Sequence, residues 1–205
     1  THLSIVSTTA ELMREIGDLT PQQERQLAKI TLAAERMQRL IHVLLALARD
    51  KDVKAADNDI KYLPDIAREI QEEDEPDARQ KGLRMVIDDR SGTTTPRLSD
   101  SFASCVLSNL VRNAVRNSTR GTITITLEPT RFSVKDEGCG IPKDEMEKIF
   151  LPFTRGKLSH GQGHGIGLSL VSRICTRMGW KIAVESEEGK GSLFTITFAE
   201  KKTPF

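Results

Sequence analysis

The sequence is poor in the residues that define several protein classes. It has only three cysteines, Cys105, Cys139 and Cys175, with no close pair for a zinc site and no even set for a disulfide framework. No apolar run approaches the roughly 18–20 residues that span a bilayer, and no signal peptide opens the chain. The 30 basic and 29 acidic residues nearly cancel, which argues against broad nucleic-acid binding. With 38% hydrophobic residues, we expect a globular chain from a reducing compartment.

The first fifty residues carry a helical pattern in two stretches. Apolar residues alternate three and four positions apart, which predicts an a/d seam on each of two helices. The seam residues are Leu3, Val6, Ala10 and Met13, then Leu27, Ile30, Ala34, Met37, Ile41, Leu44 and Ala48. Residues 17–21 interrupt the pattern, where Thr20 suits an N-cap, Pro21 a first helical position and Gln23 a capping box.

Two helices alone cannot close a core. The continuous seam therefore predicts an antiparallel hairpin over residues 1–52 that pairs with a second copy in a homodimeric four-helix bundle. Packing of the hairpin on the rest of the chain is the alternative. The polar, aperiodic residues 50–59 mark a boundary before a second domain at 60–205.

The second part mixes helix and strand patterns without regular alternation. It predicts helices at 63–80, 101–117, 143–149 and 167–178, and strands at 83–88, 122–127, 131–135, 181–186 and 192–198. We therefore expect an α+β fold, in which one helix layer covers one mixed sheet.

A helix with three asparagines is the first segment that could carry chemistry. Asn109, Asn113 and Asn117 are four residues apart, so they share one face. An amide oxygen can bind a hard cation such as magnesium, and Arg116 can bind phosphate. A solvated helix face is the alternative.

Three glycine-containing segments follow along the chain. Asp136 ends a strand and can accept from an exocyclic amine, while Gly138 and Gly140 allow close backbone approach; a tight turn is the alternative. Residues 161–168 alternate four glycines with other residues before a helix, which suits phosphate binding but could be a flexible loop. This segment fits neither the Rossmann fingerprint nor the P-loop. Residues 189–192 alone predict only a hairpin turn.

Together, in this order and spacing, the four segments resemble the N, G1, G2 and G3 boxes of the sensor histidine kinase ATP-binding domain. This is the Bergerat fold, a two-layer α/β sandwich shared with gyrase, mismatch-repair and heat-shock chaperone ATPases. Residues 149–153 resemble the F box, and the likeness covers about 60–198. Residues 37–49 resemble the end of the second helix of the dimerisation and histidine-phosphotransfer domain.

The resemblance implies a role for each matching residue. Asn113 would hold Mg²⁺, Arg116 would approach the phosphates of ATP, and Asp136 would bind the adenine amine. Residues 154–165 would form a mobile lid, with Arg155 and Lys157 contacting the γ-phosphate. The other implied nucleotide residues are Asn109, Asn117, Gly138, Gly140, Ile141, Phe153, Gly163, His164, Gly165, Ile166, Gly167, Leu168 and Ser192. Asn117 stands where the family commonly has an aromatic residue, which predicts weak ATP binding.

The family's phosphoryl acceptor is a His followed by an acidic residue. The four histidines here are followed by Leu3, Val43, Gly161 and Gly165. Aligning the first helix puts the acceptor four residues before Thr1, and Thr1 itself at a position used in dephosphorylating the response regulator. We therefore expect a fragment that binds ATP but does not autophosphorylate, with His2 as a displaced acceptor as the alternative.

The resemblance implies the cytoplasmic catalytic portion of a sensor histidine kinase. Its γ-phosphoryl group would pass to a His and then to an Asp of a response regulator receiver domain. Upstream segments would anchor the full protein in the cell membrane. A hydrolytic ATPase is disfavoured because Asn109 stands where such enzymes carry a Glu base. A degenerate, non-catalytic ATP-binding signalling module is the other alternative.

Overall fold

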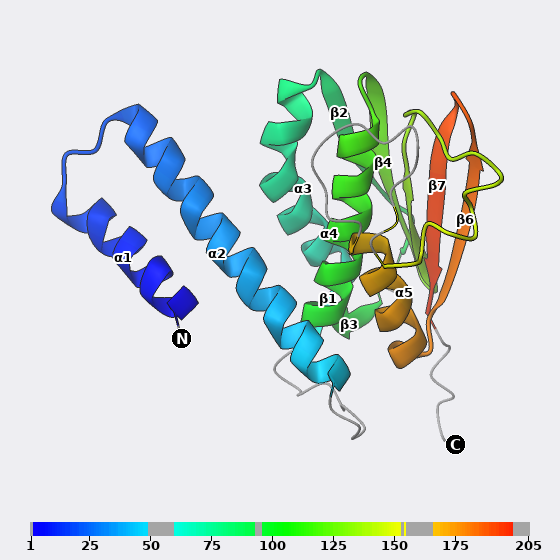
Figure 1. Ribbon diagram of the computed structural model, residues 1–205, viewed down its shortest axis with the longest axis horizontal. Coiled ribbons are helices and arrows are strands. Elements are labelled where there is room, and N and C mark those ends of the chain that lie inside the picture. The colour runs from blue at the N-terminus through cyan, green and yellow to red at the C-terminus, as the bar shows by residue number, and fades with distance from the viewer. Residues whose placement is uncertain (1, 49–59, 93–95, 153, 155–165, 199–205) are drawn as a thin grey trace. The chain divides into compact units, whose positions relative to one another are not determined.

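The computed structural model describes residues 2–48, 60–92, 96–152, 154 and 166–198 (Figure 1). The chain divides into two compact units, Thr1–Val53 and Lys54–Phe205. The functional roles expected for 1–52 and 60–205 stay predictions. None of the helices in the described ranges is long and apolar enough to cross a membrane.

The N-terminal unit is a helical hairpin of α1 (His2–Ile16) and α2 (Pro21–Ala48). The capping box at the start of α2 is confirmed. The backbone N–H of Gln23 donates to Oγ1 of Thr20 at 3.3 Å, and the backbone N–H of Thr20 donates to Oε1 of Gln23 at 2.9 Å. These two bonds satisfy donors that the helix itself leaves open, so α2 begins where the sequence predicts.

The hairpin buries only part of its apolar seam. Ala10, Leu27 and Ala34 are at most 6% exposed. Other seam residues lie open, with Met13 51%, Ile30 49%, Met37 48%, Ile41 46% and Leu44 42% exposed. The small contact that two helices make leaves this apolar surface in water within one chain.

The C-terminal unit contains a mixed five-stranded sheet in the order β2-β4-β5-β7-β6. β2 pairs with β4 in parallel, and the other neighbours are antiparallel. The strands are β2 (Leu83–Asp89), β4 (Gly121–Glu128), β5 (Arg131–Lys135), β6 (Lys181–Glu187) and β7 (Gly191–Thr197). All five were predicted from their apolar and β-branched residues, within one residue at most ends.

Three helices cover one face of this sheet (Figure 1). They are α3 (Leu63–Gln80), α4 (Asp100–Asn117) and α5 (Gly167–Met178). The core lies between the layers, where strand residues such as Ile125, Phe132 and Phe194 are at most 1% exposed. The alternating strand residues on the other face, such as Thr124 and Thr195, are only half-buried. The predicted helix layer on one mixed sheet is therefore confirmed.

Three short segments differ from the sequence predictions. The helix expected at 143–149 is wrong: the segment forms successive turns, with Glu145 N donating to Pro142 O and Lys148 N to Glu145 O. Seven residues are too few to repay the cost of nucleating a helix. The sequence also failed to indicate β1 (Ile60–Tyr62) and β3 (Arg97–Ser99), an antiparallel pair. Three residues show no readable alternation.

Candidate functional site

The last turn of α4 brings three predicted site residues together. Oδ1 of Asn113 accepts hydrogen bonds from Nη2 of Arg116 at 2.9 Å and from Nδ2 of Asn117 at 3.0 Å. The spacing of three and four residues places both donors over the same helix face. The cluster presents an amide oxygen and a guanidinium at one point, which suits a cation and a phosphate respectively.

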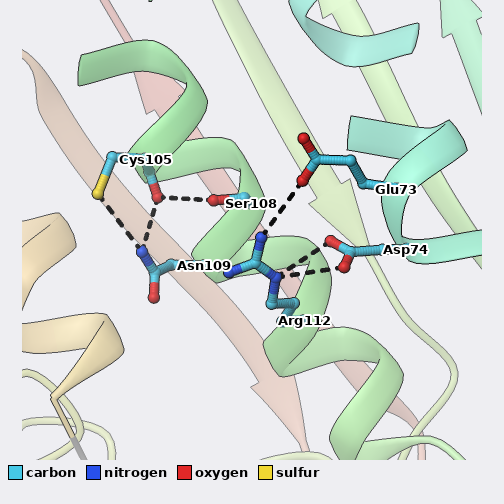
Figure 2. Close-up of polar contacts among 6 residues, drawn as sticks. All are labelled: Glu73, Asp74, Cys105, Ser108, Asn109 and Arg112. Atoms are coloured by element: carbon cyan, nitrogen blue, oxygen red, sulfur yellow. Dashed lines mark hydrogen bonds and ion pairs between the residues drawn. The ribbon is translucent and has the colours of Figure 1, made fainter. Parts of the chain in front are cut away.

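Asn109 lies outside this hydrogen-bonded cluster. Its Nδ2 donates back to the carbonyl of Cys105 at 2.7 Å (Figure 2). Its Oδ1 lies against the start of α5, because a Cβ placed on Gly167 would be only 2.8 Å from that oxygen. Asn109 therefore positions α4 against α5, and Gly167 is needed for that contact.

An ion pair that we did not predict from the sequence joins α4 to α3. Arg112 Nε lies 3.2 Å from Oδ1 and 3.3 Å from Oδ2 of Asp74, and its Nη2 lies 3.8 Å from Glu73, both on α3 (Figure 2). The side chain of Asp74 is only 3% exposed. A usable signal existed, because Asp74 follows Ile70 by four residues on the buried stripe of α3. A carboxylate on such a stripe requires a cation.

Asp136 lies just after β5 and is 3% exposed. Its backbone N–H donates to the carbonyl of Ser192 at 2.9 Å, and its Oδ1 accepts from the N–H of Gly138 at 2.9 Å. Burial raises the pKa of the Asp136 carboxyl, and the Gly138 bond opposes that rise. The carboxyl is thus a fixed acceptor at the end of the central strand β5.

The glycines after Asp136 allow other backbone segments of the same chain to pack closely against this loop. A Cβ on Gly138 would lie 2.4 Å from the carbonyl of Asn117, and one on Gly140 2.1 Å from the carbonyl of Glu187. Gly140 also has φ +67°, which favours glycine. Cys139 completes the contact, because its N–H donates to Asn117 O at 3.1 Å and its carbonyl accepts from Gly189 N at 2.8 Å. The 138–140 loop therefore joins the end of α4 to the β6–β7 turn.

Lys81 also holds the end of α4, and no local sequence pattern indicated this contact. Its Nζ donates to the carbonyls of Val115 at 2.9 Å and Arg116 at 3.2 Å. A cation at a helix C-terminus favours the helix dipole and satisfies carbonyls that the helix leaves open. Together with Cys139, this lysine fixes the turn that carries the Asn113 cluster.

Ser186 links Ile141 to Ser192 through hydrogen bonds. Oγ of Ser186 accepts from the N–H of Ile141 at 2.8 Å and lies 3.0 Å from Oγ of Ser192. Asp136 and Ser192 line a shallow pocket of about 320 Å³. Its other lining residues are Lys135, Glu185, Ser186, Glu187, Lys190, Gly191 and Leu193. Asn113 and Arg116 do not line this pocket, so it is at most one edge of the predicted site.

Several predicted site residues lie outside the described residues. They are Thr1, Phe153, Arg155, Lys157, Gly163, His164 and Gly165. Of the same segment, Ile166 is 42% exposed, and Gly167 and Leu168 are half-buried in the first turn of α5. Ile166 supplies no side-chain cap, so the first N–H groups of α5 lack that kind of partner. Such a helix start suits an anion.

Residues 99–202 match the family described as histidine kinase-, DNA gyrase B- and HSP90-like ATPase. The chain belongs to this family. Aerobic respiration control sensor protein ArcB of Escherichia coli (strain K12) is 31% identical over 191 residues. The alignment covers 88% of this chain and 25% of ArcB, so the chain spans about a quarter of that relative.

Solved histidine kinase structures agree with this assignment. The catalytic domain of histidine kinase ThkA is 30% identical, with TM-score 0.59, covering 68% of this chain and 95% of that domain. Full-length ShkA in complex with AMPPNP gives TM-score 0.64 at 24% identity, covering 96% of this chain and 43% of ShkA. At that identity ShkA supports the fold alone, and it does so across both units. The predicted α+β fold is confirmed, and the chain contains the catalytic ATP-binding domain of a two-component sensor histidine kinase.

Within this histidine kinase domain, the described parts of four predicted boxes contact one another in a chain: Asn109 and Asn117 on α4, the 138–140 loop, the β6–β7 turn and Gly167. The asparagine cluster ends α4, the 138–140 loop packs on that end, and Gly167 starts α5 beside Asn109. The structure thus brings together segments far apart in the sequence. The individual roles of these residues remain predictions.

Proposed function

We propose that this chain binds ATP with Mg²⁺ in its C-terminal unit and supplies the γ-phosphoryl group to a histidine. The observation that carries the proposal is the join between α4 and the 138–140 loop. It places the Asn113–Arg116 cluster and the buried Asp136 on two segments that share a backbone hydrogen bond, Cys139 N to Asn117 O at 3.1 Å. One segment suits the charged end of a nucleotide and the other its base.

Asp136 is the proposed adenine contact. An ionised carboxylate only accepts hydrogen bonds, so it selects a base that carries an exocyclic amine. The bond from the Gly138 N–H to Oδ1 holds the carboxyl in place. The AMPPNP complex of the related kinase ShkA supports nucleotide binding by this fold.

The donor set fits magnesium that arrives with the nucleotide. The residues the structure describes contain no group of three or more His, Cys, Asp or Glu that could hold a metal. Mg²⁺ instead takes one or two protein oxygens together with substrate phosphates and water, and Oδ1 of Asn113 is such an oxygen. The bound ion would neutralise charge on the phosphate oxygens. Arg116 would leave Asn113 and bind a phosphate.

The helical hairpin is the proposed dimerisation unit. Its exposed seam residues, including Ile30, Met37 and Ile41, follow the a/d pattern that packs in four-helix bundles. A second copy of the hairpin would cover them. We further propose that a response regulator receives the phosphoryl group on an Asp, and that the full-length protein is membrane-anchored with this portion on the cytoplasmic side. The family and the sensor relative ArcB support both statements.

We propose that none of the four histidines in this sequence is the phosphoryl acceptor, because none precedes an acidic residue. Radiolabelled ATP should therefore leave no acid-labile label on this chain. A longer protein that carries an acidic-flanked His should be labelled, and Asn113→Ala should abolish that label. Label on the present chain would refute this assignment and implicate His2. No label on the longer protein despite ATP binding would favour a non-catalytic module.

Calorimetric titration with ATP tests the binding itself. The chain should bind ATP more tightly with Mg²⁺ than with EDTA. Asp136→Asn should weaken binding by about ten- to a hundredfold, since a lost charge-assisted hydrogen bond is worth about 1.5–3 kcal/mol. Unchanged affinity in that variant would contradict the adenine role. A hydrolytic ATPase is the second candidate, but the amide of Asn109 cannot deprotonate water.

A further inference from the structure

The last turn of α4 carries an amide whose hydrogen bonding is half complete. Nδ2 of Asn117 donates to Oδ1 of Asn113 at 3.0 Å, which fixes the orientation of the Asn117 amide. Its Oδ1 is buried and has no hydrogen-bond donor in the structure as described. Buried acceptors are nearly always satisfied, so this oxygen marks a place where a donor from outside the chain fits.

Helix termination does not account for this side chain. The carbonyls at the end of α4 are already held, those of Val115 and Arg116 by Lys81 and that of Asn117 by the N–H of Cys139. Asparagine is also a mediocre helix former. The role of the Asn117 amide must therefore be sought in the contacts of its Nδ2 and Oδ1 atoms.

Arg116 indicates where the missing donor enters. Nη2 of Arg116 and Nδ2 of Asn117 meet at the same oxygen of Asn113, at 2.9 and 3.0 Å. When Arg116 moves to a nucleotide phosphate, one lone pair of that oxygen becomes available. The space that the guanidinium leaves adjoins the Asn117 amide. Nucleotide binding would therefore free both the lone pair of Asn113 and the space beside the Asn117 amide.

We propose that Asn117 is an outer-sphere ligand of the divalent cation. Its Nδ2 donates to the metal-binding oxygen of Asn113, and its Oδ1 accepts a hydrogen bond from a water molecule bound to the ion. The inference rests on the proposed function, which assigns the cation to Asn113. Mg²⁺ keeps several waters when it binds with phosphates, so a suitable donor accompanies it. Residues that support a ligand in this way strengthen metal binding.

Calorimetry with ATP, in Mg²⁺ and in EDTA, tests the proposal on four proteins. Asn117→Leu keeps the size of the side chain and removes both polar atoms. It should weaken Mg-ATP binding by about three- to tenfold more than it weakens metal-free ATP binding. Asn117→Asp keeps the acceptor and adds charge, so its ratio of Mg-ATP to metal-free ATP affinity should exceed that of the wild type. Thr119→Ala, an exposed neighbour, serves as the control beside the wild type.

Each other outcome rejects one statement. If Asn117→Leu weakens both forms of ATP equally, Asn117 contacts the nucleotide or only supports the fold, and the cation role is wrong. Tighter Mg-ATP binding in Asn117→Leu would mean that Asn117 competes with the ion. If the wild type binds ATP with no response to Mg²⁺, the cation site at Asn113 fails. If it binds no ATP at all, the proposed function itself fails. Thermal melting of each variant checks that it is folded.

Discussion

Large apolar side chains are mostly buried in the C-terminal unit and mostly exposed along the helical hairpin. Phe132, Phe194 and Ile125 are at most 1% exposed, whereas Met13, Ile30 and Leu45 are about half exposed. A sheet covered by three helices closes its own core. Two helices alone make a smaller contact, which leaves part of the apolar seam uncovered. The C-terminal unit therefore buries its large apolar side chains within one chain. The hairpin leaves an apolar surface exposed, and we propose that a second copy covers it.

The comparison predicts that substitutions in the two units change different measurements. A variant in the C-terminal unit should alter its free energy of unfolding or its ligand affinity without changing association. A variant on the exposed seam should alter association and leave the C-terminal unit unchanged.

Gly140→Ala should have the largest effect. The new Cβ would lie 2.1 Å from the carbonyl of Glu187 at a residue with φ +67°, so the 138–140 loop must move. We expect the free energy of unfolding to fall by about 3 kcal/mol or more, measured by urea denaturation. Gly189→Ala is the matched control, because Gly189 has φ +78° with nothing within 4 Å of the added atom. Equal losses in the two variants would show that backbone conformation, and not the close contact, requires Gly140.

Arg112→Leu should have the next largest effect. It leaves Asp74 buried without its Arg112 ion pair, which should reduce the free energy of unfolding by about 2–3 kcal/mol. The double variant Arg112→Leu with Asp74→Leu removes both charges and should recover most of the loss. Failure of the double variant to recover would indicate that packing between α3 and α4, and not charge, sets the cost.

The affinity for ATP should depend on pH through the carboxyl of Asp136. Burial raises the pKa of its carboxyl in the folded chain, so the folded state holds this proton to higher pH than the unfolded state does. The contribution of Asp136 to stability is therefore greatest below the unfolded pKa and is lost as pH rises through the folded pKa. ATP affinity should change with pH in the opposite direction, because protonation of the Asp136 carboxyl removes a hydrogen-bond acceptor. Affinity should fall by up to about tenfold as pH drops through the raised pKa.

Calorimetric titration over a pH series checks this dependence. Asp136→Asn is the control, since it cannot titrate and should show only the pH dependence of the remaining groups. A wild-type profile parallel to that of the variant would remove Asp136 from adenine binding.

Ile41→Glu should have the smallest effect on the C-terminal unit. Ile41 is 46% exposed on the hairpin, so a charge there costs the folded monomer little, about 0.5 kcal/mol or less. Analytical ultracentrifugation should show weaker self-association than the wild type, with ATP affinity unchanged. Ile5→Glu, at an exposed residue outside the predicted seam, is the comparison. Unaltered self-association in Ile41→Glu would reject the seam as the dimer contact.

The sequence predicted best what depends on neighbouring residues. The Thr20–Gln23 capping box and the helices at 63–80 and 167–178 follow from local spacing, and the structure confirms them. The turns at 143–149 defeated the same reasoning, because a short segment lacks the propagation that makes periodicity decisive.

Contacts between distant segments were harder to predict. The spacing predicted Asn109 on the same helix face as Asn113. Its side chain instead contacts Cys105 and the start of α5, and no local sequence pattern determines that orientation. Asp74 on α3 and Lys81 just after it contact α4, and these partners become visible only when the helices pack. The resemblance to histidine kinases located the boxes, while the packing showed what joins them.

The pairing of β5 with β7 has a consequence for how the site is assembled during folding. β4–β5 and β6–β7 are neighbours along the chain, but Val134 pairs with Phe194 only after the whole intervening segment, including α5, has been closed into a loop. That closure costs more chain entropy than the hairpins do and brings together residues of large sequence separation. The bond from Asp136 N to Ser192 O forms across the same two strands. The proposed adenine site should therefore form late in refolding, after most of the secondary structure.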